Sequence, residues 1–127
     1  MAFNLDWEKH GVVKEFSGSV TTEEIQVATL QVEASDRFDS CRYVINDFSA
    51  CESITVNHEI IRQIAVVDGA ATRTNPNIKI AVVTTMPGVV EMAEAYANSP
   101  HHSYPTRIFS TIEGARLWVT GNDLKEA

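Results

Sequence analysis

Near the start of the chain, "FNLDW" alternates apolar with polar positions, as half-buried β-strands do. The short polar segment "EKHG" ends in a glycine, and "VVKEFSGSV" then resumes strand character. Two such runs separated by a glycine-containing segment predict a β-hairpin. We therefore expect the chain to begin its fold with two antiparallel strands.

Helical periods follow the hairpin. Thr21 and Glu24 have the spacing of a capping box, and Ile25, Ala28 and Val32 then fall on one helical face. A second apolar face begins after "ACESITVNHE" and ends before "TRTNPN", whose proline cannot continue a helix. The positions expected to be buried on this second helix are Ile60, Ile64, Val67 and Ala71, widened by Ile61 and Ala65.

Three further apolar runs, "YVIND", "IKIAVVTT" and "TRIFS", read as strands. Helical patterns follow the last two, one beginning at Pro87 and one after a possible capping box of Ser110 and Glu113. The predicted order is β-β-α-β-α-β-α-β-α. Strands that alternate with helices favour a mixed, mostly parallel sheet. We expect an α/β fold and a single domain over residues 1–127.

Composition narrows the possible partners. The chain has 17 acidic against 10 basic residues and no basic run, which argues against nucleic acid. It contains no apolar run long enough for a membrane span, and "MAFNLDWEKHG" lacks the apolar stretch of a signal peptide. We therefore expect a cytoplasmic protein. Cys41 and Cys51 flank a predicted strand too long for a disulfide to span, so both are expected to be reduced.

Polar side chains follow the predicted parallel strands, at the edge of the sheet where ligands of α/β proteins usually bind. Helix starts also need hydroxyl groups at this edge, so capping is the simpler interpretation of most of them. The candidate ligand-binding residues are Asp47, Ser49, Thr84, Thr85, Ser110 and Thr111.

Other chemistry has less support. Ser49, His58 and Asp47 suggest a hydrolase triad, but the strained Gly-x-Ser-x-Gly turn is absent. His101 and His102 are adjacent loop residues without the spacing of a helical metal pair. We expect no catalytic residue, no metal and no cofactor.

A family resemblance covers about residues 3–119 and rests on four motifs: "HGVVKEFSGSVTTEE", "RYVINDFS", "NPNIKIAVVTTMPG" and "TRIFSTIEGARLWV". In this order they resemble the STAS domains of bacterial anti-anti-sigma factors and, more closely, the SpoIIAA-like family of bacterial proteins. In STAS regulators an Asp-Ser-Ser-Gly-like turn follows the central strand, and its serine is phosphorylated to switch partner binding. This chain has "ACESITVNHE" there instead. Ser53 and Thr55 are therefore weak phosphorylation candidates, and we expect them to cap the second helix.

The resemblance implies a small regulatory or protein-interaction module without catalysis, and we expect a homodimer with a possible protein partner. The alternative is a sensor or binder of a small apolar ligand with a shallow pocket, because the fold is similar to that of CRAL-TRIO lipid-binding domains. A hydrolase is the least favoured function.

Overall fold

Five strands form one sheet in the computed structural model, which describes residues 3–101 and 104–121. Their order across the sheet is β1-β2-β3-β4-β5; β1 runs antiparallel to β2, and the other neighbours are parallel. The mixed, mostly parallel α/β fold predicted from the sequence is confirmed. The elements are β1 (Phe3–Trp7), β2 (Gly11–Thr21), α1 (Thr22–Glu33), a 3-10 turn (Phe38–Ser40), β3 (Tyr43–Thr55), α2 (His58–Ala71), β4 (Lys79–Val83), α3 (Pro87–Ala97), β5 (Thr106–Phe109) and α4 (Ile112–Thr120).

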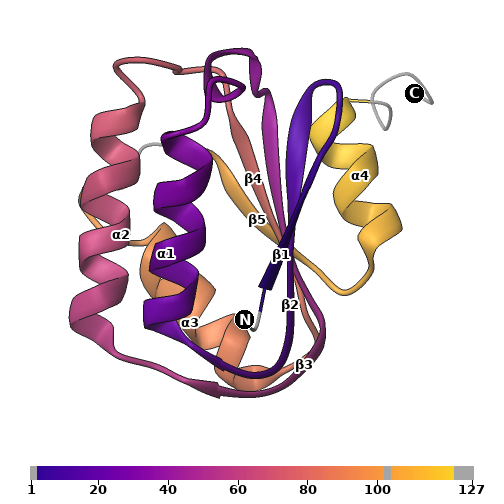
Figure 1. Cartoon of the computed structure of the whole chain (residues 1–127). Coiled ribbons are helices and arrows are strands. Elements are labelled where there is room, and N and C mark those ends of the chain that lie inside the picture. Colours follow the sequence, from indigo (N-terminus) through magenta and orange to yellow (C-terminus); the bar gives the residue numbers. More distant parts are fainter. Residues whose placement is uncertain (1–2, 102–103, 122–127) are drawn as a thin grey trace.

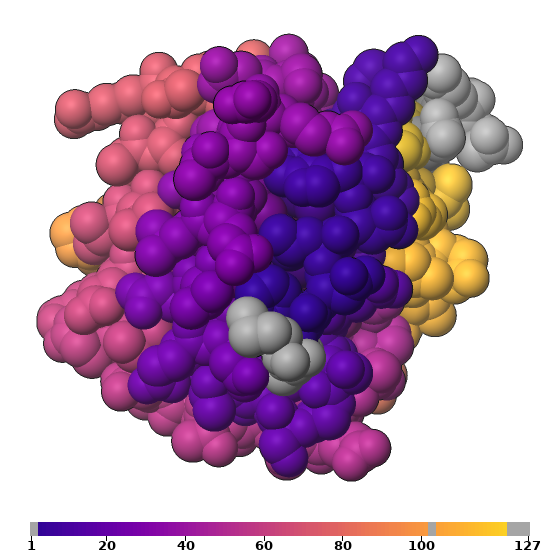
Figure 2. Space-filling view, viewed as in Figure 1, coloured from indigo at the N-terminus to yellow at the C-terminus, as the bar shows by residue number. Residues whose placement is uncertain are grey.

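The helices divide unequally between the two faces of the sheet. Helices α1, α2 and α3 cover one face and α4 covers the other (Figure 1). On the near side, α1 lies directly beside the β1–β2 hairpin (Figure 2). On the face with three helices, Phe16 and Phe48 stack with ring centroids 4.7 Å apart. On the other face, Ala115 and Val119 of α4 pack against buried residues of β2, β3 and β4, among them Ile45.

The observed helix starts agree in part with the caps predicted from the sequence. The Thr21 side chain accepts a hydrogen bond from Glu24 N at 3.2 Å, and Glu24 Oε1 accepts one from Thr21 N at 2.9 Å. The predicted capping box of α1 is thus present, and Pro87 occupies the first turn of α3 as expected. The predicted cap Ser110 is wrong by one residue, because Thr111 caps α4 and accepts from Gly114 N at 3.2 Å.

Strand β3 is much longer than predicted, and this moves the start of α2. The polar segment after "YVIND" stays in the strand because β2 pairs with it as far as Thr55. Two register shifts, one beside Gly18 with φ of 68°, let the long strands remain paired. The predicted caps Ser53 and Thr55 are therefore wrong: Asn57 caps α2, and its side chain accepts from Glu59 N at 3.0 Å.

The buried face of α2 is rotated from the predicted one. Ile61, Ile64 and Ala65 are buried, whereas Ile60 and Val67 are only half-buried. The helix also buries a carboxylate, Asp68, whose side chain replaces an apolar residue on this face. The predicted helical period is present, but the buried face is centred elsewhere because Asp68 occupies a core position in place of an apolar residue.

Candidate functional site

The structure corrects the predicted position of two candidates: Asp47 and Ser49 lie within β3, which continues to Thr55, and not at its end. Asp47 nevertheless lies beside the ends of β4 and β5. Asp47 pairs in register with Val83, the last residue of β4, and Val83 pairs with Phe109, the last residue of β5. Thr84 and Ser110 follow directly.

Four of the six candidate side chains, those of Asp47, Ser49, Thr84 and Thr111, make hydrogen bonds to residues close in sequence. Asp47 Oδ1 accepts hydrogen bonds from both the backbone N (2.9 Å) and the hydroxyl (2.5 Å) of Ser49. Thr84 is buried and accepts from Met86 N at 3.0 Å, which fixes the entry into α3. Thr85 and Ser110 are exposed. Ligand binding at this edge stays a prediction.

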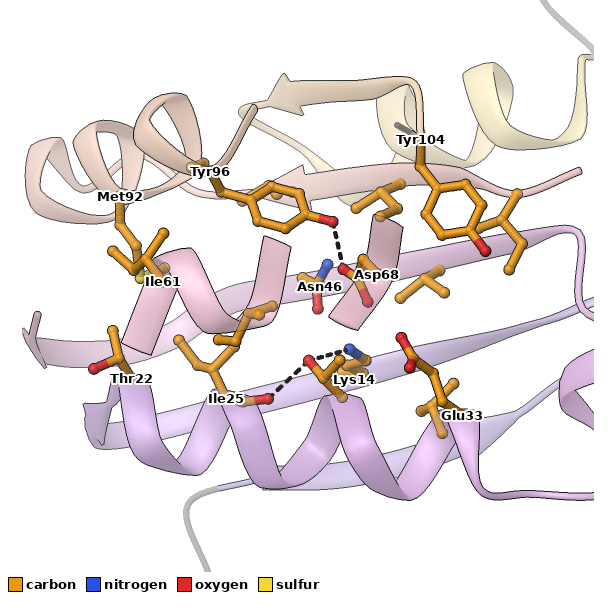
Figure 3. A pocket seen from close by; sticks show the side chains of 18 of the residues that line it. Lys14, Thr22, Ile25, Glu33, Asn46, Ile61, Asp68, Met92, Tyr96 and Tyr104 are labelled. Carbon is orange, nitrogen blue, oxygen red and sulfur yellow. Dashed lines mark hydrogen bonds between the residues drawn. The ribbon is translucent and has the colours of Figure 1, made fainter. Parts of the chain in front are cut away.

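A cavity lies elsewhere, between the sheet and the layer formed by α1, α2 and α3. Its volume is about 80 Å³, and side chains from β2, β3, β4 and all three helices line it. None of the six candidates is among these lining residues. At one end, which we call the apolar end, lie Ile25, Ile61 and Met92, together with Thr22, whose hydroxyl accepts a hydrogen bond from Asn57 N at 3.1 Å (Figure 3).

The other end, which we call the polar end, contains Lys14, Asn46, Glu33 and Asp68 (Figure 3). Lys14 and Asn46 are register partners on β2 and β3, so their side chains lie side by side on the sheet. Lys14 is 5% exposed, and its ammonium donates one hydrogen bond, to Thr29 Oγ1 at 3.3 Å. Among the described residues, Lys14 forms no ion pair and the Asn46 side chain forms no hydrogen bond.

The helices contribute the acidic groups of the polar end. Glu33 comes from the last turn of α1 and Asp68 from α2, and Asp68 Oδ2 accepts a hydrogen bond from the Tyr96 hydroxyl of α3. Burial, followed by the neighbouring Asp68 carboxyl, raises the pKa of Glu33 to about 9. Burial lowers the pKa of Lys14, although Asp68 and Glu33 oppose this change. At neutral pH Glu33 is therefore protonated beside a buried amine.

Next to the polar end, the buried side chain of Asn75 links two loops by hydrogen bonds. Asn75 donates from Nδ2 to the carbonyls of Phe38 at 2.8 Å and Cys41 at 2.7 Å. The Tyr104 hydroxyl in turn donates to the Asn75 carbonyl at 2.6 Å. Both Phe38 and Tyr104 line the cavity, so this network fixes part of its wall.

Sequence reasoning missed the polar end, although the chain carries a signal for it. Lys14 lies between Val12 and Phe16 at the two-residue period of a strand, and all three are buried. Asn46 likewise lies between two core residues of β3. On α2, Asp68 follows Ile64 by four residues, which places it on the same helical face. Polar residues at these apolar positions mark a functional site or a satisfied core group.

Comparison with known structures supports the fold. The chain is similar to the anti-sigma factor antagonist SpoIIAA in its unphosphorylated form, with TM-score 0.62, 12% identity and coverage of 94% of this chain and 99% of that one. This protein has a SpoIIAA-like fold. The phosphorylated form of the Bacillus cell fate determinant SpoIIAA gives TM-score 0.57 and 13% identity, covering 93% and 99% of the two chains.

A third similar structure is an uncharacterised protein of the DUF3478 family with a SpoIIAA-like fold, from Shewanella loihica PV-4. It has TM-score 0.52 and 11% identity, covering 93% of this chain and 92% of that one. At identities this low, the likeness extends to the fold alone. No family model and no curated protein sequence matches the chain.

Other sequence-based candidates are also located. Cys41 and Cys51 are free and buried, as expected. Within residues 3–101 and 104–121, no group of three or more potential metal ligands gathers, and His102 lies outside this part. No helix in the described ranges has the length and apolar character to cross a membrane.

Proposed function

We propose that this protein is a small regulatory module, without catalysis, that takes up a small and mainly apolar molecule between its sheet and helices α1–α3. The observation that carries this proposal is the cavity, which has apolar walls and a single polar end. Sites of this composition are typical of small-molecule binding, in which apolar contacts hold the ligand and a few polar groups orient it.

The size of the cavity limits the ligand. An engineered cavity of about 150 Å³ binds benzene, and this one measures about 80 Å³. A ligand that fits without rearrangement therefore has only a few non-hydrogen atoms. Such a ligand binds weakly, because small ligands gain at most about 1.5 kcal/mol per non-hydrogen atom. A larger ligand requires the helix layer to move away from the sheet.

A substitution that fills the cavity tests this function. Ala93 of α3 is buried and lines the cavity, so Ala93→Leu adds side-chain volume where space exists. Ala28 of α1 is also buried but is not among the lining residues, so Ala28→Leu is a size-matched control in a packed region. We expect Ala93→Leu to leave stability nearly unchanged, whereas Ala28→Leu costs about 1–3 kcal/mol.

The readout is ligand-observed NMR with a panel of small apolar compounds. Compounds that bind the parent protein are expected to lose binding to Ala93→Leu. Equal binding to both proteins, or no binding to the parent, would contradict the proposed function. Native mass spectrometry of the purified parent protein also reports whether a molecule is retained and how many subunits assemble.

A second candidate is a protein-interaction module in the cytoplasm. The SpoIIAA structures are of an anti-sigma factor antagonist, in unphosphorylated and phosphorylated forms. In this chain Ser53 and Thr55 are exposed on β3, and the exposed apolar side chains of α1 and α2 include Leu30 and Val66. Pull-down with Ser53→Asp and Leu30→Asp variants tests for a partner: an interaction unchanged by both would exclude these residues.

Assembly as a homodimer also stays a prediction. Light scattering at high concentration measures it directly. A mass equal to that of a single chain would contradict it.

A further inference from the structure

We propose that the ligand is uncharged and carries a hydroxyl or carbonyl oxygen, which accepts hydrogen bonds at the polar end of the cavity. The body of the ligand is short and apolar, and it lies against the apolar end. This inference rests on the ligand-binding function proposed above and specifies the chemistry of the molecule bound.

Unused hydrogen-bond donors are the first reason. An ammonium group has three N–H donors, and Lys14 directs one of them to Thr29. The Asn46 amide beside it adds two donors that engage no described residue. Two neighbouring side chains on the sheet therefore present donors to the cavity. A ligand oxygen at this position satisfies them, and a purely apolar ligand leaves them unpaired, which is costly away from water.

Charge balance is the second reason, and it distinguishes three kinds of head group. The polar end contains one amine and two carboxyl groups, Glu33 and Asp68, and one of these carboxyls retains its proton at neutral pH. A ligand carboxylate would accept from Lys14, but it would bring a third carboxyl group into a site that already contains Glu33 and Asp68. No other cationic side chain is among the described lining residues.

An ammonium head group is the more serious competitor, because it would balance both carboxylates if Glu33 lost its proton. However, an ammonium has no acceptor atom. It would leave the donors of Lys14 and Asn46 unpaired and place two cations in one cavity. A neutral oxygen satisfies these donors without changing the charge, so the arrangement favours it over both charged groups.

Three probes that share one apolar body test this inference: 2-methylpropan-1-ol, 2-methylpropanoate and 2-methylpropylamine. Two-dimensional ¹⁵N–¹H NMR titrations at pH 7 measure their affinities for the parent protein. We expect the alcohol to bind at least about tenfold more tightly than the amine, whose protonated group has no acceptor atom for the Lys14 and Asn46 donors, and than the acid, whose charge would lie beside two carboxyl groups.

Substitutions at the polar end test which side chains bind the ligand's oxygen. Lys14→Met retains a long unbranched side chain and should weaken alcohol binding about tenfold. Lys79→Met is the matched control, because Lys79 lies over the Trp118 ring of α4 on the opposite face of the sheet. If Lys14→Met does not fold, Asn46→Leu removes the neighbouring donors and should also weaken binding.

The outcomes separate this inference from the proposed function. Preferred binding of the alcohol, dependent on Lys14 or Asn46, supports both. If all three probes bind the cavity equally, or the amine binds best, the inference on the head group is overturned while ligand binding stands. If none of the probes shifts cavity resonances, the inference is overturned, and the Ala93→Leu comparison decides separately whether any apolar compound binds.

Discussion

Replacing Glu33 with glutamine is expected to stabilise the protein at pH 8 and to have little effect at pH 5. In the folded protein the pKa of Glu33 is raised from 4.5 to about 9, first by burial and then by Asp68. Between these two values the folded state retains a proton that the unfolded state has released. Stability therefore falls as pH rises from about 4.5 towards 9. Glutamine does not titrate, so the variant avoids this loss.

The magnitude follows from the change in pKa. At about 1.36 kcal/mol per pKa unit, a rise from 4.5 to about 9 corresponds to roughly 6 kcal/mol. Glu33 is only half-buried, and solvent screens its interactions, so the net effect is closer to about 2 kcal/mol at pH 8. The groups that face Glu33 are Lys14 of β2, Asp68 of α2, and Tyr96 and Tyr104 from α3 and the following loop.

Urea unfolding, followed by tryptophan fluorescence from pH 5 to pH 9, measures this difference. Glu91→Gln on α3 is the control, because Glu91 is an exposed carboxylate that is not among the residues lining the cavity. We expect the gap between Glu33→Gln and the parent to widen with pH, and the control to show no such trend. A gap that is constant across this range would refute the protonated state of Glu33.

Two further substitutions test local features of the fold. Asn57→Ala should lower the free energy of unfolding in urea by about 0.5–2 kcal/mol, because Asn57 caps α2. Thr55→Ala should lower it by less. The reverse order would contradict the observed start of α2. Gly69→Ala should destabilise by about 1–3 kcal/mol despite the better helix propensity of alanine, because a Cβ there would lie 2.2 Å from the His101 carbonyl oxygen. Gly114→Ala, the helical control, should change stability by no more than about 1 kcal/mol, and equal effects of the two would show that the contact with His101 is not restrictive.

The sequence predicted the order of the elements because their hydrophobic periods are regular. The buried run of β4 and the capping box at Thr21 are local signals, and both are present in the structure. The error at β3 arose because its second half is polar and lacks a strand pattern of its own. Only the length of its partner β2, together with the bulges near Gly18, keeps this segment in the sheet. Pairing between distant segments is not encoded in a local period.

The cavity was not predictable for a related reason. Its walls come from three strands and three helices, and its volume depends on how their side chains pack. The sequence does place Lys14, Asn46 and Asp68 at positions where the period calls for apolar residues. That signal shows that a polar group is buried. It does not show that the three groups converge, because convergence depends on the register of β2 with β3 and on the position of α2 over them.

Methyl NMR of the isoleucine side chains, during titration with 2-methylpropan-1-ol, tests most directly that the cavity binds a small molecule. Ile25, Ile61 and Ile64 line the cavity, whereas Ile45 of β3 and Ile112 of α4 belong to the apolar cluster on the opposite face of the sheet. We predict saturable shifts of the first three methyl resonances and none for the other two. Shifts that do not saturate, or that are equal on both faces of the sheet, would contradict binding in the cavity.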